Sequence, residues 1–72
     1  MKEKDFKEKF EIMKKKIAKS DRVYIAGANG KKFAFLINAD GYEISPNHET
    51  VDLYFRNVYV CWVDLSSVTD IN

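Results

Sequence analysis

The sequence predicts a small α+β domain that is mainly β, in which an N-terminal amphipathic helix packs on five antiparallel strands. The strands are expected to form either a small barrel or one strongly bent sheet. Three observations predict this class: apolar residues at helical spacing near the N-terminus, a change to a period of two after Arg22, and turn dipeptides between short segments. A chain of 72 residues has room for one core, so we expect a single domain over residues 1–72.

The first element is a predicted helix over residues 5–19. Its apolar side chains recur at spacings of four, three and four residues and would form one narrow stripe: Phe6, Phe10, Met13 and Ile17. Asp5, with Glu8 three residues later, fits a capping box at the start of the helix. Acidic residues crowd its first half and lysines its last turns, which suits the helix dipole at both ends.

A β unit is predicted over residues 22–71, where the residues become β-branched or aromatic and alternate with polar ones. Asn29-Gly30 favours a two-residue type I′ hairpin, because both central positions of that turn need a positive φ. Asp40-Gly41 marks a second turn. A short strand over residues 42–45 follows it, and Pro46 stops that strand.

The C-terminal part of the β unit contains two strands, over residues 51–56 and 58–63, joined by a tight turn near Arg56-Asn57. The second of these strands is apolar on both faces, and we expect one alternating set to fill the core: Val58, Val60 and Trp62. The other set is left for the helix or for another chain: Tyr59, Cys61 and Val63. Aliphatic residues three apart then indicate a 3₁₀ turn around Ser66-Ser67 and a closing strand: Leu65, Val68 and Ile71.

Two groups of these residues resemble the signatures of the Sm-like proteins, a family of SH3-like barrels with an N-terminal helix. The first signature, an apolar strand, a turn, a second strand and Asp-x-aromatic, is similar to a set spread over the first hairpin: Val23, Ile25, Asn29, Gly30, Phe33, Ala34, Leu36, Asp40 and Tyr42. The second is similar in outline to a set near the C-terminus: Val63, Asp64, Leu65, Val68 and Ile71. The resemblance implies an RNA-binding protein that assembles as a ring.

Two departures from the family pattern affect the expected activity. Glu43 stands where the family has an Asn that holds a base, and Asp64 and Leu65 stand where it has a basic residue and a Gly. An acidic side chain near a phosphate repels the backbone whose neutralisation supplies most nucleic-acid affinity. The resemblance therefore supports the fold more than it supports RNA binding.

Charge and cysteine content restrict the cellular location that we expect for the protein. Residues 1–19 carry eight lysines and four acidic side chains, whereas residues 20–72 carry four basic and seven acidic side chains, so the two parts have opposite net charges of +4 and −3. The one cysteine cannot form an internal disulfide, and the charged N-terminus does not resemble a signal peptide, so we expect a cytoplasmic protein. No apolar stretch approaches the roughly 20 residues that span a bilayer, so no membrane is expected.

The aromatic residues are the main candidates for a binding surface, because they outnumber the places in one small core. Tyrosine, tryptophan and arginine are enriched at binding hot spots. The candidate protein-binding set is Tyr24, Tyr42, Tyr54, Arg56, Tyr59 and Trp62. The alternative is that the helix covers these rings. Three consecutive lysines on the helix could contact an anion, with a solvated helix face as the alternative: Lys14, Lys15 and Lys16.

Residues that could support catalysis or metal binding are few. His48 lies near Glu49 and Asp52 but sits in a polar loop after Pro46, where a solvated histidine needs no further explanation. A buried Cys61 would behave as a small hydrophobe with poor nucleophilicity. No zinc-ligand spacing and no cofactor motif is present in the sequence, so we expect neither a metal, a cofactor nor an enzymatic activity.

Two functional hypotheses follow. The first is a small non-enzymatic protein that binds a protein partner, as an adaptor, a regulatory subunit or an inhibitor of the kind that mobile elements encode. The alternative is an Sm-like RNA-binding ring protein. The sequence leaves the identity of the partner open, and it also leaves open whether the chain forms a homo-oligomer.

Overall fold

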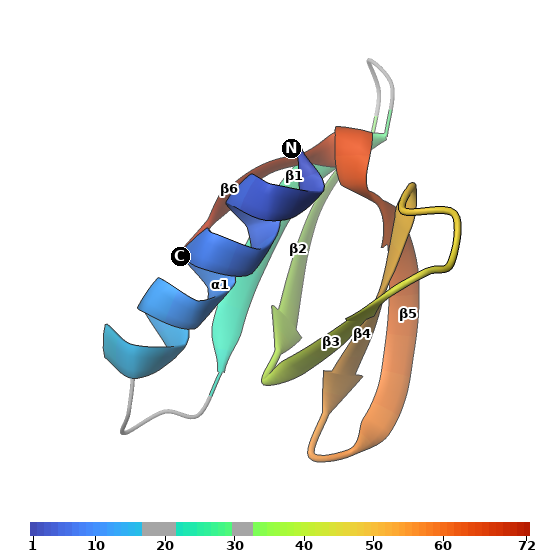
Figure 1. The fold of residues 1–72 in the computed structure, drawn as a ribbon. Helices are drawn as coiled ribbons and strands as arrows, with labels where there is room; N and C mark the ends of the chain where they lie inside the picture. Colours follow the sequence, from blue (N-terminus) through green and yellow to red (C-terminus); the bar gives the residue numbers. More distant parts are fainter. Residues whose placement is uncertain (17–21, 30–32) are drawn as a thin grey trace.

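The computed structural model describes residues 1–16, 22–29 and 33–72. This part of the chain forms one helix, six strands and a 3₁₀ turn in the order α1 (Glu3–Lys16), β1 (Val23–Asn29), β2 (Phe33–Ala39), β3 (Gly41–Ile44), β4 (Thr50–Phe55), β5 (Val58–Asp64), η1 (Leu65–Ser67) and β6 (Val68–Ile71). The strands make two antiparallel three-stranded sheets, in the orders β2-β1-β6 and β3-β4-β5 (Figure 1). The predicted α+β, mainly β class is confirmed.

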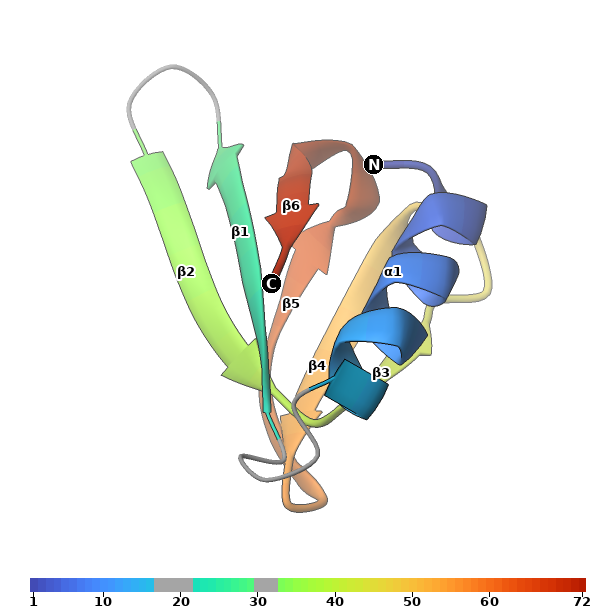
Figure 2. The ribbon, with the colours of Figure 1, turned by 90° about the vertical axis from the view of Figure 1, so that its left-hand side faces the viewer.

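The expected five-stranded arrangement is wrong, because the described strands number six and are divided between two sheets. The physical reason lies at Asp40, the single residue between β2 and β3. Its backbone N–H donates a hydrogen bond to the carbonyl of Tyr54, 3.0 Å away, at the end of β4. The chain therefore leaves the first sheet and enters the second within one residue. Figure 2 shows the two sheets diverging from this end, with α1 beside them.

The core lies between the two sheets and α1. Phe6 and Phe10 are buried on the helix, and both rings meet Tyr42 of β3 edge-on, with ring centroids 5.2 and 4.7 Å from it. The remaining core residues come from all parts of the β unit: Val23, Ile25, Ala39, Val51, Leu53, Val63, Leu65, Val68 and Ile71. The predicted apolar stripe of the helix is thus confirmed at Phe6 and Phe10, while Ile17 lies outside the described residues.

The helix begins earlier than predicted. It starts at Glu3, and the N–H of Phe6 donates to the carbonyl of Lys2 at 2.9 Å, so the first turn is already closed when the chain reaches Asp5. Asp5 therefore lies within the first turn, where its charge suits the helix dipole, and it does not cap the helix. The expected end at residue 19 falls outside the described residues.

The predicted turns and hairpins are largely confirmed. β1 and β2 pair in register as far as Asn29↔Phe33, although the predicted type I′ turn falls on residues outside the described part. Arg56 and Asn57 form the turn between β4 and β5, both with left-handed φ values of 51° and 65°, as a type I′ turn requires. The predicted 3₁₀ turn and closing strand are η1 and β6.

The residues of β5 that face the core are not those expected. Val58, Val60 and Trp62, which were expected in the core, are exposed, whereas Val63 is buried and Cys61 is half-buried. The pairing of β4 with β5 explains this result. Val51 and Leu53 of β4 are fully buried and lie opposite Val63 and Cys61, so these two residues of β5 share the inner face.

Candidate functional site

The outward face of the sheet β3-β4-β5 brings together three aromatic side chains that lie outside the core, those of Tyr54, Tyr59 and Trp62. We call it the outer aromatic face, and its residues are Glu43, Asp52, Tyr54, Tyr59, Val60 and Trp62. Strand alternation places them there: Tyr42 faces the helix from β3, and Val51 and Leu53 are buried on β4, so Glu43, Asp52 and Tyr54 point the other way.

The register arranges this face in two rows across the sheet. Glu43 lies opposite Asp52, and Asp52 lies opposite Trp62, which makes one row of two carboxylates and an indole. Gly41 lies opposite Tyr54, and Tyr54 lies opposite Tyr59, which makes the neighbouring row. Side chains opposite one another in an antiparallel pair lie about 5 Å apart at Cβ, so each row is a set of direct neighbours.

A β-bulge explains why two successive residues of β5 face outward. The pairing steps from Leu53↔Cys61 to Tyr54↔Tyr59, so Val60 is the extra residue on β5. Tyr59 is 49% exposed and Val60 is 45% exposed, although strict alternation would bury one of them. The bulge therefore adds an apolar side chain to the outer aromatic face.

Trp62 is the most exposed ring of this face, with 58% of its surface accessible. Tyr54 and Tyr59 contact each other edge to face, with centroids 5.8 Å apart and planes at 72°. Partial desolvation raises the pKa of both tyrosines above the ordinary value of 10.0, and the nearby carboxylates raise it further, Glu43 and Asp52 for Tyr54 and Asp52 for Tyr59. The face is thus aromatic and carries a negative potential.

The other residues predicted for a binding site lie elsewhere. Tyr42 packs against Phe6 and Phe10 and is partly buried beside the core, on the opposite side of the sheet from the outer aromatic face, and burial raises the pKa of its hydroxyl. Tyr24 is 39% exposed on β1, in the first sheet. Arg56 lies in the β4–β5 turn.

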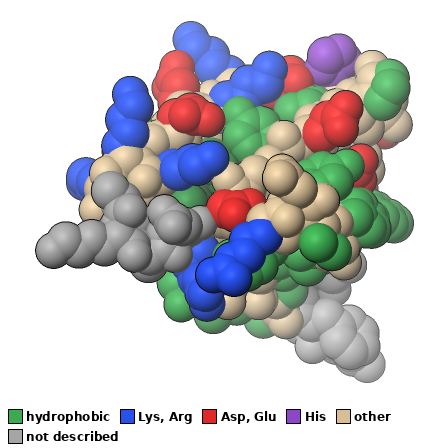
Figure 3. All heavy atoms as spheres, turned by 90° about the horizontal axis from the view of Figure 1, so that it is seen from below, with side chains coloured by type: hydrophobic (Ala, Val, Ile, Leu, Met, Phe, Trp, Pro, Cys, Tyr) green, Lys and Arg blue, Asp and Glu red, His purple; other side chains and the backbone are tan. Residues whose placement is uncertain are grey.

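Lysine and arginine side chains lie among acidic ones on the underside of the molecule (Figure 3). The three lysines predicted as an anion contact form the last turn of α1 and are exposed. Lys14 also lines an open hollow of about 420 Å³ together with Asp40, Gly41, Tyr54, Arg56 and Asn57. Next to this hollow, the guanidinium groups of Arg22 and Arg56 lie 5.0 and 5.3 Å from the centre of the Phe55 ring, which is within cation–π range.

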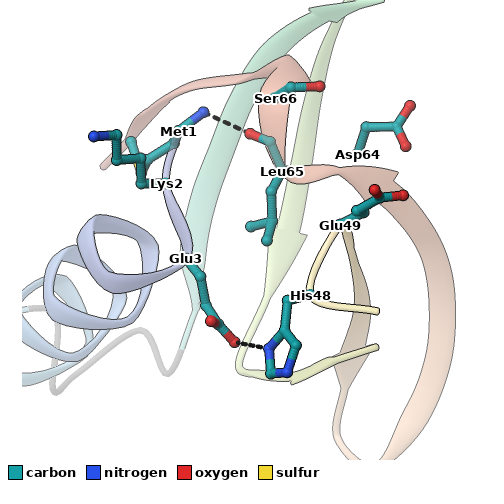
Figure 4. A pocket seen from close by; sticks show the side chains of 8 residues that line it. All are labelled: Met1, Lys2, Glu3, His48, Glu49, Asp64, Leu65 and Ser66. Atoms are coloured by element: carbon teal, nitrogen blue, oxygen red, sulfur yellow. Dashed lines mark hydrogen bonds and ion pairs between the residues drawn. The ribbon is translucent and has the colours of Figure 1, made fainter. Parts of the chain in front are cut away.

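A second hollow, of about 730 Å³, lies where the N-terminus, the loop before β4 and η1 meet (Figure 4). Its lining is rich in acidic side chains, with Glu3, Glu49 and Asp64 beside His48. The N-terminal ammonium of Met1 donates to the carbonyl of Leu65 at 2.6 Å, which fixes one wall of the hollow.

Figure 4 draws one contact between two side chains across the hollow. It is the hydrogen bond between Nδ1 of His48 and Oε1 of Glu3, which are 2.9 Å apart. This hydrogen bond is the main reason why the pKa of Glu3 lies below its ordinary value of 4.5. The contact links the loop before β4 to the start of α1, so its evident role is to hold these segments together. Within residues 1–16, 22–29 and 33–72, no three His, Cys, Asp or Glu side chains are close enough together to hold a metal ion.

Cys61 lies on the inner face of the second sheet, where it is half-buried and opposite Leu53. Desolvation raises the pKa of its thiol above 9.0, which lowers the fraction of reactive thiolate at neutral pH. The side chain packs against the core, as expected for a small hydrophobe.

Comparison with protein-family models, with curated proteins and with solved structures finds no match. In the described part of the chain, no helix has both the length and the apolar character needed to cross a membrane.

Sequence reasoning missed three members of the outer aromatic face: Glu43, Asp52 and Val60. The signal for Asp52 was present, because it alternates with Tyr54 on one face of β4. Val60 carried no such signal, since its outward position depends on the bulge.

Proposed function

We propose that this protein is a non-enzymatic binding module and that it docks a protein partner on the outer aromatic face. The observation that carries the proposal is the exposure of Trp62 beside Tyr54, Tyr59 and Val60 on one side of a sheet. Large exposed apolar patches on small proteins mark interaction sites, and tryptophan and tyrosine contribute most of the free energy at the centres of interfaces.

The outward face of the first sheet is a weaker candidate. It exposes Leu36 and Tyr24, but Leu36 lies opposite Ala26, and Ala28 lies opposite Ala34. Alanines offer a partner little area to bury, whereas the outer aromatic face joins three rings in adjacent rows. The second sheet therefore offers the larger continuous apolar surface.

The order of elements also supports an SH3-like arrangement, which we propose as the finer description of the fold. Asp40 alone separates β2 from β3, so that the pair resembles one long strand bent between two sheets, and η1 leads from β5 into β6. The RNA-binding ring that the Sm-like resemblance implied is less well supported. Glu43 lies on the outer aromatic face and Asp64 in the acidic hollow, and both carboxylates would repel phosphates.

The proposal is tested by capturing partners from a lysate with tagged protein and weighing the intact complexes by mass spectrometry. Trp62→Ala and Tyr59→Ala should each reduce the captured partner strongly. Leu36→Ala is the matched control, because it removes a side chain that is 64% exposed on the other sheet. Circular dichroism must show that all three variants fold. Capture that survives Trp62→Ala and Tyr59→Ala would contradict docking on this face.

A further inference from the structure

The row Glu43, Asp52, Trp62 carries two negative charges with no compensating cation among the described residues. Glu43 and Asp52 lie directly opposite each other on β3 and β4. Like charges in this position destabilise a sheet. The ion pairs of the described residues join Glu3 to Lys7 and to His48, and Asp70 to Lys9, so none of them reaches this row.

The surroundings strengthen the effect of these two charges. The carboxylates lie beside Tyr54 and raise the pKa of its hydroxyl, after the larger effect of desolvation. Residues 20–72 as a whole carry a net charge of −3, so the row belongs to an acidic part of the chain.

We propose that the partner docked on the outer aromatic face is a basic protein segment, and that one of its arginine or lysine side chains lies over Trp62 and contacts the carboxylates of Asp52 and Glu43. This inference rests on the proposed docking function and names the chemistry of the partner. An indole is the best aromatic acceptor for a cation, and the cation–π attraction grows when the site is removed from water. Neighbouring carboxylates add charge-assisted hydrogen bonds to the same side chain.

The mixture of apolar and acidic side chains on this face indicates that the cation belongs to a protein segment. The row borders Tyr59 and Val60, which are both exposed. An occupant that covers this surface has to bring apolar area together with positive charge. A peptide segment that combines arginine or lysine with apolar residues meets both conditions, whereas a nucleic acid would bring phosphates to two carboxylates.

The defined probe is a blocked peptide, acetyl-Gly-Arg-Leu-Arg-Gly-amide, and its matched control has citrulline in place of both arginines. Trp62 is the only tryptophan of the chain, so intrinsic fluorescence and the single indole N–H resonance both report on this face. We expect the arginine peptide to shift both signals saturably in the millimolar range, and the citrulline peptide to bind at least tenfold more weakly, a factor that corresponds to about 1.4 kcal/mol. Binding should weaken as salt rises from low to physiological concentration.

The charges are tested with the double variant Glu43→Gln, Asp52→Asn, which should weaken peptide binding about tenfold. Its matched control is Glu8→Gln, Glu11→Gln, which removes the same charge from exposed positions of α1. Absence of a saturable shift, equal binding of the citrulline peptide, or unchanged binding by the Glu43, Asp52 variant would each overturn the inference. So would concentration-dependent self-association of the protein that shields Trp62, because the occupant would then be a second copy.

The same variants separate this inference from the docking proposal. If the captured partner is lost in Trp62→Ala but retained in the Glu43→Gln, Asp52→Asn variant, the face binds a partner by apolar contacts and the basic-segment inference fails alone. If the partner is retained in Trp62→Ala as well, both proposals fail. Loss of the partner in both variants supports both.

Discussion

Both carboxylate oxygens of Asp40 accept a hydrogen bond from the backbone N–H of Arg56, at 3.1 and 3.0 Å. Asp40 is the residue at which the chain passes from one sheet to the other, and Arg56 begins the turn between β4 and β5. Arg56 holds a left-handed φ of 51°, which is unfavourable for a residue with a Cβ. The hydrogen bonds therefore help to stabilise the left-handed backbone conformation of Arg56 in this turn.

Asp40→Ala should lower the free energy of unfolding by about 1–2 kcal/mol, because it removes a charged acceptor from a backbone donor. Asp40→Asn should cost less, since the amide oxygen can still accept one hydrogen bond. Urea unfolding followed by circular dichroism measures both, with Glu11→Ala as an exposed control on α1. If Asp40→Ala is as stable as the control, the contact contributes nothing to the turn.

Gly27 and Gly41 make a second comparison, because they differ in the space around the missing Cβ. A Cβ on Gly27 would lie 2.2 Å from the carbonyl oxygen of Ser67 and 2.3 Å from Cζ of Phe35, whereas one on Gly41 would lie 3.9 Å from Cβ of Tyr54. Gly27→Ala should therefore destabilise the domain by about 3 kcal/mol or more, because the backbone of η1 has to move.

The Gly41→Ala variant is the control and should change stability by less than about 1 kcal/mol, since 3.9 Å is an ordinary van der Waals contact. Thermal unfolding of both variants measures the difference. Equal stability of the two would mean that β1 and η1 are not packed as closely as the structure shows.

Tyr42 and Tyr59 test the division between core and outer aromatic face. Tyr42 packs between Phe6 and Phe10, so Tyr42→Ala should remove about 2–4 kcal/mol of stability through the cavity that it leaves. Tyr59→Ala removes an exposed ring and should lower Tm by about 2 °C or less. Calorimetry on the two variants decides. A collapse of Tm in Tyr59→Ala would place that ring in the core.

The elements that the sequence predicted correctly depend on local chemistry. Phe6 and Phe10 show the helical period directly, and the positions of the 3₁₀ turn and of the turn at Arg56-Asn57 follow from residues close in sequence. The faces of β5 could not be predicted in this way, because the strand is apolar on both sides and its period of two gives no preference. Which side is buried depends on its pairing with Val51 and Leu53, which is a tertiary contact.

The candidate site could be predicted only in part from the sequence, because part of it depends on tertiary contacts. An excess of tyrosine and tryptophan over the available core volume predicts that some rings are exposed, and Tyr59 and Trp62 are. That Tyr42 instead contacts α1 could not be predicted, because it depends on how the helix lies across β3. The row of Glu43, Asp52 and Trp62 could not be predicted either, because it depends on the pairing register of three strands, two of which are separated by a loop.

The Glu3–His48 contact predicts a specific acid dependence of stability. The hydrogen bond from His48 holds the pKa of Glu3 below 4.5, so the folded state favours the carboxylate. Such a group contributes stability that is fully present above its unfolded pKa of about 4.5 and is lost as the pH falls through the lower folded value. Wild-type Tm should therefore fall as the pH drops below about 4.5, partly because of Glu3.

Glu3→Gln removes this contribution, so the variant should have a lower Tm than the wild type at pH 6, and the difference should shrink as the pH falls below about 4.5. Asp70 supplies an internal comparison, because its hydrogen bond with Lys9 lowers its pKa from the ordinary value of 3.8, so the loss of its contribution begins at a lower pH than the loss of the Glu3 contribution, which begins at about 4.5. The Tm difference between Asp70→Asn and the wild type should accordingly begin to shrink at a lower pH than the difference for Glu3→Gln. Tm curves for Glu3→Gln and the wild type that stay parallel from pH 6 to pH 3 would show that the bridge between the loop and α1 does not stabilise the folded state.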